Sequence, residues 1–169
     1  MQMTCVGAPM IYYGTEAGMW GADDPCDRMP MVWAKLDYDA QTADPLGRPR
    51  TADAMAFDKE LFNFYQAAIG LRAQSPALRR GDFEFTAKDD AAQFLAFRRA
   101  TDEQQLFVGF NRGENSYRWE IPLSDKEMAM QIFTASGNAD QVSVENGEGK
   151  ATIVIPALDG VVIRIQSKE

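Results

Sequence analysis

Carboxylates in the first third of the sequence are the side chains best placed to do chemistry. Glu16 lies a few residues before the adjacent pair Asp23 and Asp24. Two carboxylates held close together can supply an acid and a base, so Glu16 with Asp23 or Asp24 could form a two-carboxylate site with Glu16 as general acid. The alternative is that Glu16 is a structural carboxylate, which accepts hydrogen bonds from backbone or arginine groups.

Two tryptophans and an acid–arginine pair in the same stretch suit a neutral ligand rich in hydroxyl groups. Trp20 and Trp33 carry flat faces that could stack on sugar rings, and the alternative is that they pack within the loop or a core. Asp24 precedes Arg28 by one helical turn in sequence spacing. Charged groups make strong hydrogen bonds to hydroxyls, and a carboxylate can hold an arginine fork in place. The alternative is an ordinary salt bridge between the two side chains.

The supply of metal-ligating residues is small. The sequence contains no histidine, which removes histidine-based catalysis and histidine metal ligands. Its two cysteines, Cys5 and Cys26, are too few for a zinc tetrad, and we expect two unpaired thiols, with a single disulfide as the alternative. The acidic run GADDPCD, residues 21–27, lacks the spacing of an EF-hand loop. We therefore predict no metal site and no cofactor.

Composition indicates a folded chain without a nucleic-acid or membrane partner. The 169 residues are 46% hydrophobic and 25% charged, which is enough apolar material for a core. The formal net charge of −8 argues against binding to a phosphate backbone. No apolar run reaches the roughly 18 residues that a membrane-spanning helix needs. The start, MQMTCVGAPMIYYG, has no basic region typical of a signal peptide, and the compartment stays open.

A long loop between two regular elements holds these side chains. The apolar run CVGAPMIYYG, residues 5–14, is typical of a fully buried strand. The polar stretch 15–50 is rich in Asp, Gly and Pro, and loops of this length usually have a function. Apolar residues spaced by three and four predict a helix over 52–73 that is buried on more than one side, with Thr51 or Asp53 as its N-cap.

The predicted secondary structure changes from helix to strands after a short helical turn. In SPALRRG, Ser75 suits an N-cap, Pro76 a first helical position and Gly81 a stop. Beyond this turn, alternating apolar and polar residues predict strands, separated by turns that contain Asn, Asp or Gly. Short strands at spacings of roughly ten residues indicate an antiparallel sandwich or barrel. The predicted strands are 82–88, 93–100, 104–111, 116–121, 131–135, 141–145, 150–155 and 161–166.

The first strand, the loop and the helix cannot form a domain by themselves. A single strand has two edges that need hydrogen-bonding partners, and a helix buried on two sides needs neighbours that this sequence does not offer. We therefore expect the chain to begin inside a larger domain. Residues 1–80 would be the remnant of that domain, and residues 81–169 would form an all-β C-terminal domain.

The segment GAPMIYYGTEAGMWGADDPCDRMPMVW carries a family resemblance. Its first part resembles the motif G-x-P-x-I-Y-Y-G-x-E of the eighth barrel strand in the α-amylase family, glycoside hydrolase family thirteen. Its continuation, G-M-W-G-x-D-D-P-x-x-R-x-P-M-x-W, resembles the neopullulanase and cyclomaltodextrinase branch. Cys26 and Asp27 depart from the branch, which usually has them in the opposite order, so no role is assigned to Asp27. The matching residues are Gly7, Pro9, Ile11, Tyr12, Tyr13, Gly14, Glu16, Gly18, Met19, Trp20, Gly21, Asp23, Asp24, Pro25, Arg28, Pro30, Met31 and Trp33.

The resemblance implies a mostly β fold. A Greek-key β-sandwich, the family's domain C, would follow the last strand, loop and helix of a truncated (β/α)8 barrel. The resemblance also implies that the nucleophile, the acid and a third Asp of retaining glycoside hydrolysis lie upstream of this sequence. We therefore predict no catalytic residue in the chain and favour the structural role for Glu16. The parent enzyme would cleave α-glucans, and the chain alone would be inactive.

Three hypotheses follow for the role of the chain. In the leading one it buttresses the catalytic barrel of its parent, where Asp24, Arg28 and Trp20 bind the maltooligosaccharide substrate, as the resemblance implies. In the second it is a non-catalytic carbohydrate-binding module that uses Trp20, Trp33 and Trp119, although alternation on the strand favours Trp119 as a core residue. In the third it is an assembly domain, because an exposed barrel remnant could form a homo-oligomer.

Overall fold

A computed structural model describes residues 1–21, 24, 28–44 and 46–168. The chain forms two compact units. Met1–Ala8 and Ile69–Glu169 make up the first, which we call the β unit, and Pro9–Ala68 make up the second, which we call the loop unit.

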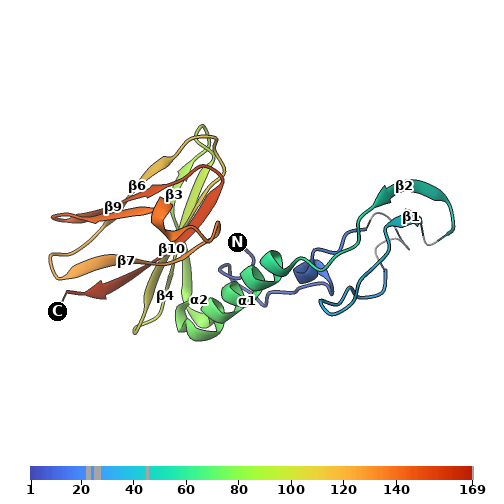
Figure 1. The fold of residues 1–169 in the computed structure, drawn as a ribbon. Coiled ribbons are helices and arrows are strands. Elements are labelled where there is room, and N and C mark those ends of the chain that lie inside the picture. The colour runs from blue at the N-terminus through green and yellow to red at the C-terminus, as the bar shows by residue number, and fades with distance from the viewer. Residues whose placement is uncertain (22–23, 25–27, 45, 169) are drawn as a thin grey trace. The chain divides into compact units, whose positions relative to one another are not determined.

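Strands dominate the β unit, as predicted (Figure 1). Each of the predicted strands is present, and their ends differ from the prediction by a few residues. The strands are β3 (Asp82–Asp89), β4 (Phe94–Ala100), β5 (Gln105–Asn111), β6 (Tyr117–Pro122), β7 (Glu127–Thr134), β8 (Ser143–Asn146), β9 (Lys150–Ile155) and β10 (Asp159–Ser167).

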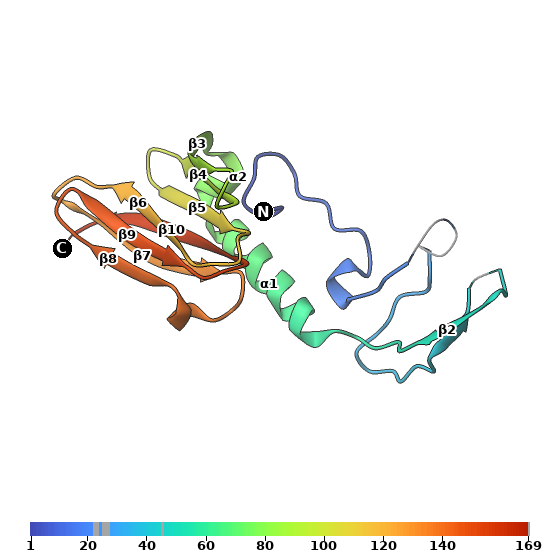
Figure 2. The same ribbon diagram turned by 90° about the horizontal axis from the view of Figure 1, so that it is seen from above.

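The strands form a sandwich of two antiparallel sheets. The first sheet has the order β3-β4-β5-β10-β7 and the second the order β6-β9-β8. Figure 2 shows β6, β9 and β8 as neighbours. Strand β6 pairs with β9, and β7 pairs with β10, so each pairs with the strand three places further along the chain. This pairing is the Greek-key arrangement, and the antiparallel sandwich confirms the predicted fold class.

Apolar side chains from alternate strand positions fill the space between the sheets. Trp119 on β6 is 4% exposed, and its ring centroid lies 6.2 Å from that of Phe107. The prediction that Trp119 belongs to the core is confirmed. The hypothesis of a carbohydrate-binding module therefore loses this residue, because both sheets cover its ring. Other members of the core are Phe94, Ile121, Ile153, Ile155 and Ile163.

The outer face of the five-stranded sheet packs on the short helix α2 (Pro76–Arg80), which confirms the predicted helical turn. Ser75 occupies the predicted N-cap position but makes no side-chain capping bond. The side chain of Gln104 caps the helix instead, since its Oε1 accepts the N–H of Ala77 at 3.1 Å. Buried side chains in this second core are Ala77, Leu78, Phe97, Leu106, Val108 and Val162.

Two arginines attach the first residues of the chain to the β unit. Arg99 on β4 is only 1% exposed, and its guanidinium donates to the carbonyl oxygens of Thr4, Gly81 and Asp82. Burial lowers the pKa of Arg99, and the nearby charge of Arg72 lowers this pKa further. Arg72 donates to three further carbonyl oxygens, those of Met3, Cys5 and Gly7. These bonds explain why Met1–Ala8 belongs to the β unit.

The loop unit has little regular structure. It contains a short 3-10 helix, η1 (Thr15–Ala17), a hairpin of β1 (Gln41–Ala43) and β2 (Pro49–Asp53), and the first part of helix α1 (Lys59–Gln74). Gly14, which precedes η1, has a φ of 84°. This left-handed conformation favours glycine. The N–H of Asp58 donates to the carbonyl of Ala17 at 3.0 Å and ties η1 to the start of α1.

The buried strand predicted for residues 5–14 is wrong. This segment has no strand, and Met10 and Tyr12 on it are 74% and 48% exposed. A strand needs a neighbour that satisfies its N–H and C=O groups. None of the described strands pairs with this segment, so it stays irregular.

The predicted helix exists, but its start and its burial differ from the prediction. Helix α1 begins at Lys59 because residues Pro49–Asp53 form strand β2. Its N-cap is Asp58 rather than Thr51 or Asp53, since Asp58 Oδ1 accepts the N–H of Leu61 at 2.9 Å. Among its residues only Ala68 is fully buried, whereas the apolar pattern predicted burial on more than one side.

Candidate functional site

Asp24 and Arg28, two of the predicted substrate-binding residues, form an ion pair in the loop unit. Arg28 Nε lies 2.8 Å from Asp24 Oδ1, and the two side chains are 68% and 66% exposed. An exposed pair contributes little to stability. The carboxylate holds the guanidinium and leaves its other N–H donors open to a ligand. Asp23, Cys26 and Asp27 of the same acidic stretch lie outside the described residues.

Trp20, the third predicted binding residue, contacts Arg50. The ring is 40% exposed, and the guanidinium carbon of Arg50 lies 4.2 Å from its centroid, a cation–π distance. Asp53 holds this arginine, because its Oδ2 accepts a hydrogen bond from Arg50 Nη2 at 2.6 Å. Arg50 therefore covers one face of the indole, and a sugar ring could stack only on the other face.

Arg50 is positioned by the β1–β2 hairpin, which the sequence analysis treated as loop. Asp44 Oδ1 accepts the N–H groups of Leu46 and Arg48, each at 2.9 Å, and Gly47 has a φ of 79°. These bonds favour the charged carboxylate, so the pKa of Asp44 lies below its usual value, chiefly because of the backbone N–H of Arg48. The Asp-x-x-Gly spacing of Asp44 and Gly47 is a turn signal that could have revealed the hairpin.

Glu16 borders an apolar cavity of about 1120 Å³ in the loop unit. Its Oε2 atom is buried and has no hydrogen-bond partner among the described residues. This oxygen therefore lacks the backbone or arginine partner that the structural interpretation predicts. The other carboxylate, Asp24, is occupied by Arg28. Apolar walls of the cavity are Tyr13, Met31, Trp33, Ala34, Leu36, Phe57 and Phe62.

The loop around this cavity is held by backbone bonds to side chains. The N–H of Trp33 donates to the hydroxyl of Tyr38 at 2.7 Å, and the hydroxyl of Tyr13 donates to the carbonyl of Met29 at 2.9 Å. Val32 is 2% exposed, whereas the neighbouring Trp33 is 59% exposed. Trp33 is therefore not a core residue, whereas packing within the loop is compatible with its place in the lining of the cavity.

The described residues offer no arrangement for a metal ion. Within residues 1–21, 24, 28–44 and 46–168, no group of three or more His, Cys, Asp or Glu side chains lies where it could hold one. Cys5 is a free thiol, and Cys26 lies outside the described residues. No helix in the described part of the chain is both long and apolar enough to span a bilayer.

Known proteins resemble this chain in sequence and in fold. Cyclomaltodextrinase of Geobacillus thermopakistaniensis is 33% identical over 122 residues, which are 72% of this chain and 18% of that protein. Neopullulanase 2 of Thermoactinomyces vulgaris is 31% identical over 154 residues, which are 90% of this chain and 22% of that protein. The crystal structure of α-amylase from H. orenii superposes with a TM-score of 0.70 at 22% identity, over 97% of this chain and 33% of that one. No protein-family model matches the sequence.

The sandwich and its preceding loop and helix therefore have the fold of the corresponding part of a solved α-amylase. The chain belongs to the α-amylase family, glycoside hydrolase family thirteen, in its neopullulanase and cyclomaltodextrinase-like branch. It spans about a fifth of the length of the curated relatives that it matches, 18% and 22% of the two named above.

Proposed function

We propose that the chain acts as part of an α-glucan-cleaving glycoside hydrolase, in which it buttresses a catalytic barrel. Its curated relatives are named as a cyclomaltodextrinase and a neopullulanase. Residues 1–80 would contribute to the barrel, and residues 81–169 would form the C-terminal β domain that supports it. The chain alone would cleave no α-glucan, because the family resemblance assigns none of its residues to the catalytic carboxylates.

The observation that carries this proposal is the uncovered apolar surface of the loop unit. Met10 is 74% exposed, and Trp33 and Leu36 are each 59% exposed at the rim of the apolar cavity. Trp33 and Leu36 line the same cavity, and exposed apolar surface of this kind marks a site that another protein segment covers. Further barrel segments of the same enzyme would cover this surface and would also supply a partner for the buried Glu16 oxygen.

A chimeric enzyme tests the proposal. The stretch of Thermoactinomyces vulgaris neopullulanase 2 that matches this chain is replaced by the chain itself, and release of reducing sugar from pullulan is measured. We expect the chimera to be active and the purified chain alone to be inactive. Turnover by the chain alone would overturn the predicted inactivity. A folded chimera without activity would overturn the buttress role.

We propose further that Asp24, Arg28 and Trp20 contact the sugar substrate in the assembled enzyme. The ion pair supports this role, because it fixes the guanidinium while both side chains remain largely exposed. The exposed part of the Trp20 ring adds an apolar face next to the charge of Arg50. Hydroxyl donors and acceptors on a sugar suit a carboxylate and a guanidinium, and its C–H faces suit the indole.

A second candidate function is self-assembly, and the same apolar surface supports it. If no other barrel segment covers Met10, Trp33 and Leu36, a second copy of the chain could do so. Sedimentation velocity over a range of concentrations separates the two candidates. A dimer that Leu36→Glu dissociates would favour self-assembly, whereas a monomer at high concentration would exclude it.

A further inference from the structure

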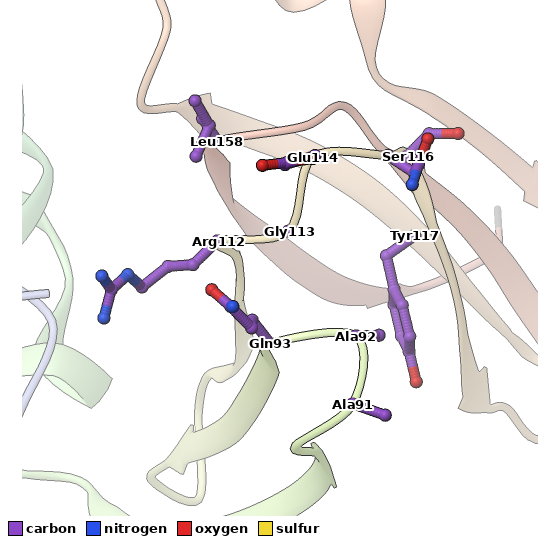
Figure 3. Close-up of a pocket in the computed structure, with 10 residues that line it drawn as sticks. Ala91, Ala92, Gln93, Arg112, Gly113, Glu114, Ser116, Tyr117 and Leu158 are labelled. Carbon is purple, nitrogen blue, oxygen red and sulfur yellow. The ribbon is translucent and has the colours of Figure 1, made fainter.

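Three turns of the β unit meet at one end of the sandwich and enclose a cavity of about 480 Å³. The turns connect β3 to β4, β5 to β6, and β9 to β10. Figure 3 shows one side chain from each turn, Gln93, Arg112 and Leu158, around the backbone of Gly113. Cavities of this volume accommodate small molecules.

Buried Asn111 holds two of the three turns together, namely those that connect β5 to β6 and β9 to β10. Its side chain is 1% exposed, and its Nδ2 donates to the carbonyl oxygens of Asn115, Ile155 and Pro156. Its Oδ1 accepts the N–H of Gly113 at 3.0 Å. One amide side chain therefore satisfies backbone groups of two turns, and the walls of the cavity are fixed before any ligand arrives.

One backbone bond attaches the third turn, which connects β3 to β4, and a second backbone bond links the other two turns. The N–H of Arg112 donates to the carbonyl of Gln93 at 3.0 Å, and the N–H of Leu158 donates to the carbonyl of Gly113 at 3.3 Å. The turns approach so closely at Gly113 that a Cβ atom there would lie 2.6 Å from the carbonyl oxygen of Ala92. Only glycine permits this contact between the two turns.

Two strained residues border this cavity. Gln93 has a φ of 55° and Leu158 a φ of 57°, and no other non-glycine residue in the described ranges has a positive φ. Left-handed backbone is unfavourable for residues with a Cβ, and in folded proteins such strain gathers at ligand sites. Leu158 is also 77% exposed, so its side chain adds nothing to the core. Glycine would suit both positions better for folding alone, which indicates that the two side chains serve another purpose.

Polar side chains around the cavity are available to a ligand. Gln93, Arg112 and Glu114 make no side-chain hydrogen bond or ion pair with any described residue, and the same holds for Asn115 and Ser116. Figure 3 shows Gln93 and Arg112 projecting to the same side of the turns. The set supplies both donors and acceptors. Because Arg112 and Glu114 carry opposite charges, the cavity has no net preference for an anion or a cation.

Apolar surface completes the site. The Tyr117 ring stands beside Ala92 in Figure 3 and stacks on Phe94, with ring centroids 4.0 Å apart and an interplanar angle of 15°. This stacking fixes the orientation of the phenol. Leu158 lies on another side of the cavity. A ligand that matches these walls has hydroxyls around its edge and C–H groups on its faces, which describes a hexose ring.

We propose that this cavity is a non-catalytic binding site for a neutral sugar, namely one or two rings of an α-glucan chain. The choice of α-glucan rests on the proposed function, whereas the choice of a neutral, hydroxyl-rich ligand rests on the cavity alone. The site would hold a long substrate on the β unit while the enzyme acts on it elsewhere.

The test follows the Leu158 methyl groups by NMR while maltoheptaose is added to the chain. We expect saturable shifts of these methyls at millimolar sugar. Leu158→Gly should raise the Kd for maltoheptaose about tenfold, because a Leu contact of this kind is worth roughly 1.4 kcal/mol. Since glycine relieves the strained backbone, the melting temperature should stay the same or rise. Leu46→Gly, which removes another exposed leucine outside the cavity, should leave the Kd unchanged.

Several outcomes would overturn the proposal. One such outcome is that the Leu158 methyl signals do not shift when maltoheptaose is added. Another is that Leu158→Gly binds maltoheptaose as tightly as the unsubstituted chain. Shifts caused by inorganic phosphate but not by maltoheptaose would show that the ligand is an anion. Gln93→Gly serves as an independent second variant with the same expectation. The experiment requires no catalysis, so failure of the chimeric enzyme does not affect it. The variant Trp20→Ala distinguishes sugar binding at the loop unit from sugar binding at this cavity.

Discussion

The guanidinium of Arg99 donates a hydrogen bond of 2.8 Å to the carbonyl oxygen of Thr4, although 95 residues separate the two in sequence. Neither Arg99 nor its neighbour Arg72 has a carboxylate among the bonds that hold it. Six backbone carbonyls satisfy the two guanidinium groups instead. The first residues of the chain therefore complete the polar network of a sandwich whose strands begin only at Asp82.

Replacing Arg99 tests this network. Arg99→Met keeps much of the apolar stem but removes the guanidinium donors of three carbonyl oxygens, of which that of Thr4 is part of a fully buried bond. We expect the free energy of unfolding of the β unit to fall by about 3 kcal/mol. Urea denaturation measures the change.

The neighbouring Arg98 is the matched control. It is 34% exposed and pairs with Glu84 at 3.2 Å on the surface. Arg98→Met should cost less than about 1 kcal/mol, because an exposed ion pair is worth little. Equal losses in the two variants would mean that the buried carbonyl network does not stabilise the β unit.

The environment of Tyr117 leads us to expect that the β unit loses stability at alkaline pH. Burial raises the pKa of its phenol, and the carboxylate of Asp89, 3.5 Å from the hydroxyl, raises this pKa further. The fold thus favours the neutral form. This contribution to stability is fully present below the pKa of an unfolded tyrosine, about 10, and disappears as the pH rises through the higher folded value. Tyr117→Phe should weaken this alkaline dependence of the free energy of unfolding.

Two measurements check the alkaline prediction. Urea denaturation at a series of pH values above neutral gives the dependence, and ultraviolet absorbance of tyrosinate follows ionisation. Tyr65→Phe on α1 is the control and should leave the dependence unchanged. The prediction fails if the parent chain and Tyr117→Phe lose stability equally with pH.

Local patterns explain why the β unit was predictable. Alternation in residues 94–100 and 150–155 reflects two sheets that share one core. These residues form β4 and β9, and both partners of each of these two strands lie within this chain. Asn and Asp residues at the turns indicate further boundaries, for example Asn111, whose side chain links two of the connections. Short-range sequence patterns predict strands correctly where the neighbouring strands that pair with them are present in the chain.

The errors in the loop unit have the opposite cause. Residues 5–14 have the apolar composition of a buried strand, and α1 has apolar residues on more than one face, but the described residues provide nothing that covers them. Propensity cannot override missing hydrogen-bond partners. The predicted start of α1 is too early, because Asp58 caps the helix, whereas Asp53 belongs to β2.

The candidate sites were predictable only in part. The four-residue spacing of Asp24 and Arg28 indicated their ion pair, because side chains at this spacing can meet on one turn. The contact of Trp20 with Arg50 depends on a hairpin that the sequence analysis missed. The cavity at Gln93 and Leu158 depends on positive φ values at residues that seldom adopt them, so no residue type signals it.

The core of the sandwich leaves no room for a side chain at Gly109. A Cβ at this position of β5 would lie 2.9 Å from Trp119 Cζ3 and 3.1 Å from Ile155 Cδ1. Both neighbours are buried and cannot move freely. Gly109→Ala should therefore lower the free energy of unfolding by about 1–3 kcal/mol. Gly70→Ala on α1 meets no atom closer than 3.9 Å and should instead stabilise the helix by roughly 0.5–1 kcal/mol, so thermal unfolding of the two variants should shift in opposite directions.

We expect substitutions of Asp24 and Arg28 to have coupled effects on substrate binding in the chimeric enzyme. If the carboxylate acts by holding the guanidinium against a sugar hydroxyl, then Asp24→Ala and Arg28→Ala should each raise KM for maltoheptaose about tenfold, a loss of roughly 1.4 kcal/mol. The double variant should cost about as much as Arg28→Ala alone, because removing the holder of an absent group changes nothing further.

A matched ion pair separates this role from general electrostatics. Lys88 and Asp90 form an exposed pair at 2.8 Å in the β unit, with 68% and 80% of their side chains exposed. Lys88→Ala should leave KM and kcat unchanged, because loss of a surface charge in itself has little effect on binding of a neutral sugar. If Asp24→Ala and Arg28→Ala behave like Lys88→Ala, their pair is an ordinary salt bridge. If their effects on KM simply add, each side chain contacts the sugar independently, and the holding role of Asp24 is wrong.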